Sequence, residues 1–144
     1  MARVLFVCLH NAGRSQMSET LFTAMAQGRH EARSAGTIPA EHVHDSVVTV
    51  MREKGIELSS RRPQLLTDGL ARWADVVVTM GCGDACPLIP GKHYIDWELR
   101  DPKGLSESEV RAIRDEIEKR IAGLIQSLDA NRFINGLSAR QADS

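Results

Sequence analysis

The sequence lacks a long apolar run and a large excess of charge of either sign. Within its 144 residues, no apolar stretch approaches the ~18 residues that a membrane-spanning helix needs. The apolar run over residues 4–9 is too short for the core of a signal peptide. The formal net charge is −1, which gives no indication of a nucleic-acid or acidic-membrane partner. We therefore expect a cytoplasmic protein that binds neither nucleic acid nor membrane.

Cysteines are few and odd in number. Cys8, Cys82 and Cys86 make a poor disulfide framework, and in a reducing compartment such thiols are catalytic, metal-binding or buried. The chain also lacks internal repeats, low-complexity tracts and a linker, and its length suits one core. We expect a single catalytic domain over residues 1–130 and a poorly ordered C-terminal tail over residues 131–144.

Hydrophobic patterning predicts strands that alternate with helices. Short runs rich in β-branched residues predict strands at residues 3–8, 30–35, 75–80 and 93–97. Apolar positions at helical spacing predict helices at residues 15–27, 45–54 and 106–128. Asp45 is a candidate N-cap, and Ser106 with Glu109 matches a capping box. Alternation of this kind favours a three-layer αβα fold with a four-stranded parallel sheet.

The segment that follows the first predicted strand has the composition of an anion site. Cys8 ends that strand, and ligands of open parallel sheets lie beyond the carboxyl ends of the strands. A short loop with Gly13 leads into a helix, so its backbone amides and the helix N-terminus can hold an anion. Arg14 adds a planar guanidinium suited to a tetrahedral oxyanion, and this positive environment favours the nucleophilic thiolate of Cys8.

These motifs resemble the low-molecular-weight tyrosine phosphatase superfamily, which includes thioredoxin- and mycothiol-coupled arsenate reductases. The resemblance rests on Cys8, five residues, then Arg14-Ser15 near the N-terminus, on Arg-Ser-Ala-Gly at residues 33–36, and on Asp101-Pro102. It implies a low-molecular-weight phosphatase-like fold, with Cys8 as nucleophile, Ser15 as hydrogen-bond donor to its sulfur and Asp101 as general acid. The implied oxyanion-binding loop comprises Leu9, His10, Asn11, Ala12, Gly13 and Arg14.

Two local features favour the reductase branch of that superfamily. The loop interior His10-Asn11-Ala12-Gly13 resembles the arsenate reductases, and Asn11 is implied to shape the loop, although it could also be an ordinary turn residue. Lys103 follows Asp101-Pro102, where phosphatases of the superfamily often carry a tyrosine that packs on an aromatic substrate. Asp96 and Glu98 are alternative acids, and Pro102 favours Asp101 because it restricts that residue to an extended conformation.

Cys82 and Cys86 lie in the glycine- and proline-rich segment 81–91 between two predicted strands. The resemblance implies a relay in which Cys82 attacks Cys8, Cys86 then attacks Cys82, and the new disulfide is reduced from outside. Their spacing is shorter than in the best-known thioredoxin-coupled members, so the reductant can be thioredoxin or a low-molecular-weight thiol such as mycothiol. They can also be buried or incidental thiols.

The sequence thus favours an arsenate reductase with a phosphatase side activity. The alternatives are a low-molecular-weight tyrosine phosphatase, which hydrolyses phosphomonoesters through a phosphocysteine, and a non-enzymatic oxyanion-binding thiol sensor. We expect no cofactor beyond the external thiol reductant, an arsenate- or phosphate-like oxyanion as ligand, and a monomer. No metal is expected, because Cys82, Cys86 and His93 lack a fourth zinc ligand at recognisable spacing and His42 and His44 have no third ligand in register.

Overall fold

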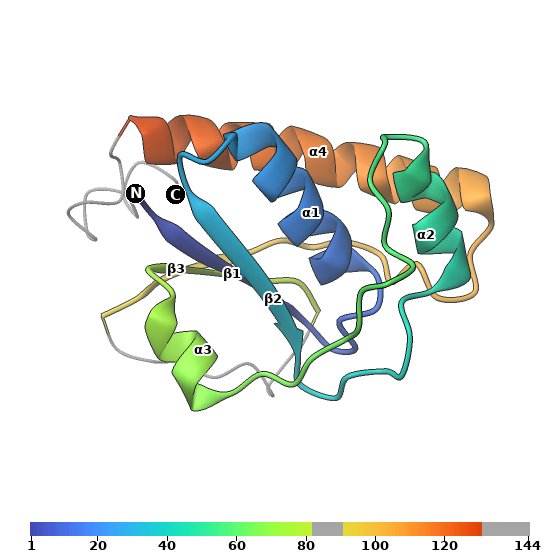
Figure 1. The fold of residues 1–144 in the computed structure, drawn as a ribbon, viewed down its shortest axis with the longest axis horizontal. Helices are drawn as coiled ribbons and strands as arrows, with labels where there is room; N and C mark the ends of the chain where they lie inside the picture. The colour runs from blue at the N-terminus through green and yellow to red at the C-terminus, as the bar shows by residue number, and fades with distance from the viewer. Residues whose placement is uncertain (82–90, 131–144) are drawn as a thin grey trace.

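The computed structural model describes residues 1–81 and 91–130. Its core is one parallel sheet whose strands lie in the order β2-β1-β3-β4 (Figure 1). The strands are β1 (Arg3–Cys8), β2 (Glu31–Gly36), β3 (Val76–Thr79) and β4 (His93–Asp96). All four predicted strands are confirmed, with ends that differ by at most one residue.

The helices form layers on both faces of this sheet. On one face lie α1 (Arg14–Ala26), α2 (Asp45–Arg52) and α4 (Glu107–Asp129), with α4 running across the other two (Figure 1). The short helix α3 (Asp68–Trp73) covers the opposite face, beside β1. The predicted αβα architecture is therefore confirmed.

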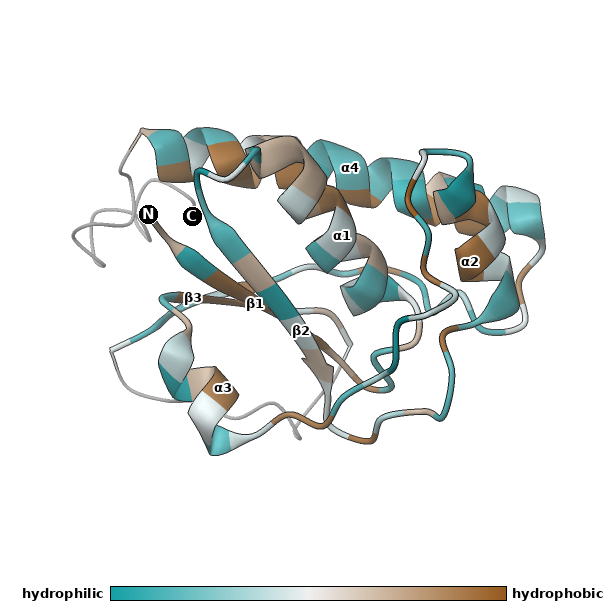
Figure 2. Ribbon diagram, viewed as in Figure 1, coloured by the Kyte–Doolittle hydropathy of each residue, from teal (hydrophilic) through white to brown (hydrophobic). Residues whose placement is uncertain are grey.

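Side chains of β1 alternate between two apolar clusters, as the two-residue period of a strand requires. Val4, Phe6 and Cys8 join the cluster under α1, α2 and α4, whereas Leu5 and Val7 join the smaller cluster under α3. The central strands β1 and β3 carry mostly hydrophobic residues (Figure 2). Since both faces of β1 are buried, its carboxyl end is fixed from both sides.

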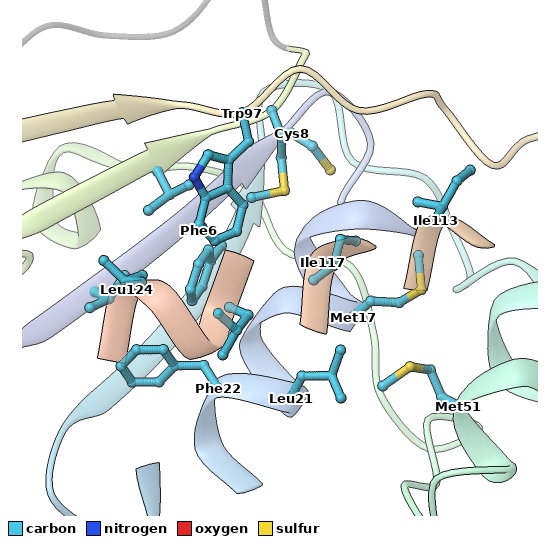
Figure 3. Packing of buried hydrophobic residues seen from close by; sticks show 14 of the residues in the cluster. Phe6, Cys8, Met17, Leu21, Phe22, Met51, Trp97, Ile113, Ile117 and Leu124 are labelled. Carbon is cyan, nitrogen blue, oxygen red and sulfur yellow. The ribbon is translucent and has the colours of Figure 1, made fainter. Parts of the chain in front are cut away.

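Aromatic rings pack directly below the end of β1. The Phe6 ring lies 5.8 Å from that of Phe22 and 6.0 Å from that of Trp97, measured between centroids (Figure 3). Full burial of a Phe side chain contributes about 1.5–3 kcal/mol. Cys8 therefore stands on a rigid apolar base, two residues beyond Phe6 on the same face of the strand.

The helix ends differ in detail from the predictions. The capping box at Ser106 and Glu109 is confirmed. The prediction of Asp45 as N-cap is wrong: His44 occupies that position, and Asp45 lies in the first turn, where a carboxylate interacts favourably with the helix dipole. Helix α3 was not predicted, because six residues are too few to display helical periodicity; it begins after Thr67, whose hydroxyl accepts a bond from the amide of Leu70.

Within residues 1–81 and 91–130, no helix combines the length and the apolar character that crossing a bilayer demands.

Candidate active site

The sulfur of Cys8 lies at the carboxyl end of β1, between the ends of β2 and β3 in the sheet. The residue is 2% exposed, and Figure 3 shows its side chain beside Trp97 at the edge of the core. The hydroxyl of Ser15 lies 2.8 Å from the sulfur, and the backbone amide of Asn11 donates to it at 3.3 Å. Hydrogen bonds of this kind stabilise a thiolate more than a thiol.

The loop from Cys8 to Gly13 is held by the crossover that follows β2. Backbone amides of that crossover donate to four loop carbonyls: Thr37 to Cys8 (3.3 Å), Ile38 to Leu9 (2.8 Å), Ala40 to His10 (3.0 Å) and His44 to Ala12 (3.0 Å). Because these four carbonyls are bonded to the crossover, they do not face an anion on the other side of the loop. This arrangement suits a loop whose backbone amides bind an anion.

Asn11 has the special backbone geometry of this loop. Its φ is +50°, in the left-handed region, which asparagine tolerates better than most residues. Its side chain is buried and points into the protein: Nδ2 donates to Ser15 Oγ at 2.7 Å, while Oδ1 accepts from the amide of Gln64 at 3.0 Å. Asn11 therefore links the loop to Ser15 and to the chain that precedes α3.

Gly13 has a second role besides the one predicted. Its φ of −145° and ψ of −90° lie outside the α and β regions that other residues occupy, in line with the prediction. In addition, a Cβ at this position would lie 2.5 Å from Cγ of Pro102. Glycine allows the Asp101-Pro102 segment to approach the loop closely.

Arg14 and Asp101 face each other beside the loop. Arg14 is 7% exposed, and its Nη1 donates to the carbonyl of Leu99 at 3.2 Å. Its Nη2 lies 3.8 Å from Oδ2 of Asp101, whose side chain is 43% exposed. Gly81 packs against the same guanidinium, because a Cβ there would lie within 2.3 Å of Nη1, and its φ is +86°. A basic group and an accessible carboxylate therefore meet at one edge of the loop.

His44 is a site neighbour to which the sequence assigned no role. It caps α2, and its ring lies close to Gly13. Burial lowers the pKa of His44 below its usual value, against the opposing influence of the Asp101 carboxylate. The sequence signal was an isolated His-x-His, which does not distinguish a surface segment from a residue beside the loop.

Three further polar residues behind the loop were also missed. Gln16, Arg61 and Gln64 are joined to Asn11 directly or through one another. Gln16 lies on α1 and is fully buried, and the other two come from the segment before α3. No local pattern marks them, since the contacts join residues far apart in the sequence.

The other predicted candidates are the two further cysteines, the alternative acids and a metal site. Cys82 and Cys86 lie outside the described residues. Of the alternative acids, Asp96 accepts from the Thr79 hydroxyl at 2.7 Å. Across residues 1–81 and 91–130, no three or more His, Cys, Asp or Glu side chains gather in a way that could hold a metal ion.

Comparison with known proteins agrees with this arrangement. The chain matches the low molecular weight phosphotyrosine protein phosphatase family over residues 3–133. It is 41% identical to a putative arsenate reductase of Halobacterium salinarum, over 86% of this chain and 91% of the relative.

Two solved structures are also similar. The thioredoxin-dependent arsenate reductase of Corynebacterium glutamicum has a TM-score of 0.80 and 44% identity over 91% of this chain, which spans 63% of that longer chain. The YwlE arginine phosphatase of Geobacillus stearothermophilus has a TM-score of 0.79 and 28% identity, over 94% of this chain and 97% of that one. This chain therefore belongs to the low-molecular-weight phosphotyrosine protein phosphatase family of enzymes.

Proposed function

We propose that this protein is an arsenate reductase in which Cys8 is the nucleophile. The observation that carries the proposal is the Cys8 sulfur, bonded to Ser15 and to a loop amide, with Arg14 and Asp101 beside it. Relatives at 41% and 44% identity bear the name arsenate reductase, which favours arsenate as the oxyanion.

In the first half of the reaction, the Cys8 thiolate attacks the arsenic of HAsO₄²⁻. The loop amides and Arg14 neutralise the oxyanion charge, and an arsenic–sulfur bond forms as the arsenic–hydroxyl bond breaks. Asp101 gives its proton to the departing hydroxide, which leaves as water. Its partial exposure gives solvent access for the return of the proton in every cycle, and its place beside Arg14 puts it next to the bound oxyanion.

In the second half, two electrons pass from thiols to arsenic. Cys82 attacks the Cys8 sulfur, the arsenic–sulfur bond breaks, and its electron pair stays on arsenic, which leaves as arsenite. Cys86 then attacks Cys82 and restores the Cys8 thiolate, and thioredoxin or a low-molecular-weight thiol reduces the resulting disulfide. Gly81, the residue before Cys82, packs against Arg14, which supports the reach of this segment to the site.

Phosphomonoester hydrolysis is the second candidate function. The family name favours it, and the first half of the chemistry is the same with phosphorus in place of arsenic. Water would then release phosphate from Cys8 without any change of oxidation state. Because this route needs no other cysteine, we propose it as a side activity.

Coupled turnover tests the proposal. The reduced protein is incubated with arsenate and with either thioredoxin plus its reductase or mycothiol plus its redoxin, and NADPH consumption is followed. We expect consumption that depends on arsenate in at least one system. No consumption in either, together with rapid hydrolysis of p-nitrophenyl phosphate, would make the protein a phosphatase. Oxyanion binding without turnover of either substrate would make it a sensor.

Replacing the nucleophile tests Cys8 itself. Cys8→Ser should abolish both arsenate reduction and p-nitrophenyl phosphate hydrolysis, because both begin with attack by this sulfur. Circular dichroism of the variant checks that it is folded. Retention of either activity at a rate near that of the wild type would show that Cys8 is not the nucleophile.

A further inference from the structure

A line of side-chain hydrogen bonds continues behind the loop, away from the oxyanion site. Arg61 Nε donates to Gln16 Oε1 at 2.7 Å, and Gln16 Nε2 donates to Asn11 Oδ1 at 3.0 Å. Asn11 Nδ2 then donates to Ser15 Oγ, which lies 2.8 Å from Cys8 Sγ. Four contacts thus join a partly exposed arginine to the nucleophilic sulfur.

The direction of these bonds follows from what each group can donate. A guanidinium has only donors, so Gln16 must turn its oxygen toward Arg61 and its amide group toward Asn11. The Asn11 oxygen is then occupied, and its amide group must face Ser15. Because the Ser15 oxygen accepts from Asn11, its own hydrogen is free to point at the sulfur of Cys8. Every hydrogen in the line is directed toward the sulfur.

A second donor supports the same direction at Asn11. The backbone amide of Gln64 also donates to Asn11 Oδ1, at 3.0 Å, and a backbone amide cannot accept. Asn11 therefore keeps its orientation without Arg61. Gln16 keeps its orientation as well, because its Nε2 donates to that fixed oxygen and to the carbonyl of Arg62 at 3.5 Å. What Arg61 adds is its positive charge at the outer end of the line. Loss of Arg61 should weaken the line without breaking it.

Burial and an ion pair at the outer end hold this line of hydrogen bonds in place. Gln16, Asn11 and Ser15 are fully buried, where hydrogen bonds polarise one another more than in water. Arg61 is itself fixed at its outer end: its Nη2 donates to Oε1 of Glu19, the oxygen that also accepts from the Ser34 hydroxyl at 2.6 Å. The side chains of Arg61 and Glu19 are 34% and 14% exposed, so this ion pair is partly shielded.

We propose that Arg61 is a positioning residue whose charge, through Gln16 and Asn11, strengthens the hydrogen bond from the Ser15 hydroxyl to the Cys8 sulfur and so raises the thiolate fraction of Cys8. The proposal rests on the proposed function only in taking Cys8 as the nucleophile. It does not depend on which oxyanion is the substrate.

The test measures the pH profile of Cys8 alkylation by iodoacetamide in the full-length protein, read on the Cys8 peptide by mass spectrometry. Arg61→Met, which has no donor, should raise the midpoint of the profile by about half a pH unit, a roughly threefold loss of thiolate below the midpoint. Arg61→Lys, which keeps the positive charge and again has only donors, should restore most of the wild-type midpoint. Arg61→Gln can hydrogen-bond but carries no charge, so it should shift the midpoint the same way as Arg61→Met.

Arg62→Met is the matched control, because Arg62 is an exposed neighbour of the same charge that meets Gln16 through its backbone carbonyl. Its midpoint should stay at the wild-type value. An equal shift in Arg62→Met, or no shift in folded Arg61→Met or Arg61→Gln, would overturn the proposal. Alkylation needs no substrate, so this test is independent of the proposed function. A shifted profile in a protein that does not reduce arsenate would uphold the role of Arg61 and reject the reductase. An unshifted profile in a protein that reduces arsenate would reject the role of Arg61 and uphold the reductase.

Discussion

At the scale of single residues, Asp101 is the carboxylate that can deliver a proton beside the oxyanion loop. Asp101→Asn should slow formation of the Cys8 adduct by about 10²–10⁴-fold, since general acid catalysis typically contributes that much. Oxyanion affinity should change little, because Arg14 and the loop amides remain. Rapid-quench measurement of the adduct and competition by inorganic phosphate separate the two effects.

Asp96→Asn and Glu98→Gln are the matched controls for Asp101. The Asp96 carboxylate is engaged by the Thr79 hydroxyl between β3 and β4, so its loss should leave adduct formation near the wild-type rate. If either control slows adduct formation more than Asp101→Asn does, the acid has been assigned to the wrong residue.

Gly81 leaves the space that the Arg14 guanidinium occupies. A methyl group in Gly81→Ala would overlap Nη1 of Arg14 and push the guanidinium from its place, so we expect a several-fold rise in the KM for arsenate. Gly55→Ala is the control, because Gly55 also has a positive φ, +74°, but its Cβ would meet nothing within 4 Å. Both variants should lose stability of about 1 kcal/mol from backbone strain. A KM that rises equally in both would reject the steric explanation.

At the scale of elements, an ion-pair cluster joins the end of α2 to α4. Arg111 donates twice to Glu53, at 2.9 and 2.7 Å, and Arg114 donates to it at 2.7 Å. Arg114 also donates to the carbonyl of Val50 at 2.8 Å, so one guanidinium contacts both the backbone and the side chains of α2. The hydrogen bonds from Arg111 and Arg114 lower the pKa of Glu53 to about 2.

The lowered pKa of Glu53 makes the stability of the fold depend on pH. A carboxylate whose pKa is lower in the folded than in the unfolded state stabilises the fold at pH values above the unfolded-state pKa. This contribution is lost as the pH falls toward the folded-state pKa. Glu53→Gln should therefore lower Tm at pH 7, and its difference from the wild type should shrink between about pH 4.5 and pH 2. Thermal melts over this range by circular dichroism measure it.

Glu57→Gln provides the comparison for Glu53. Glu57 has a pKa lowered to about 2 as well, through hydrogen bonds from Arg52 and Ser59, but these partners lie within five residues of it. Because this pair does not join two helices, its loss should lower Tm less than the loss of Glu53. A larger effect at Glu57 would mean that the contact between α2 and α4 does not depend on the ion pairs.

At the scale of the whole molecule, the two halves of the proposed reaction separate by mutation. Cys82→Ser should leave an arsenylated Cys8 that turns over only with an added small thiol. Cys86→Ser should complete one turnover and stop with Cys8 joined to Cys82. Disulfide mapping by mass spectrometry after one equivalent of arsenate reads both states. Wild-type protein that turns over on mycothiol while Cys82 and Cys86 stay free would reject the relay and leave a reductase resolved from outside.

The sequence predicted what short-range patterns encode. The strand that ends at Cys8, the spacing from Cys8 to Arg14 and the capping box at Ser106 are all local, and local patterning was enough to predict the sheet and the loop at its edge. The same reasoning could not find Gln16 or Arg61, because a glutamine on a helix and an arginine in a loop acquire their meaning only when folding brings them together. It also predicted that the backbone of Gly13 needs glycine, but it could not find the second constraint at that position, which comes from Pro102 across the fold.

The four bonds from the crossover to the loop carry a consequence for how this chain can vary. The donors at residues 37, 38, 40 and 44 pair in the same order with acceptors at residues 8, 9, 10 and 12, so the two segments must keep a fixed alignment. Insertion of one residue between Ile38 and Ala40 would displace the later donors and leave the carbonyls of His10 and Ala12 to turn toward the anion. Natural length variation should therefore collect elsewhere on the surface and spare this connection, even though it has no regular secondary structure.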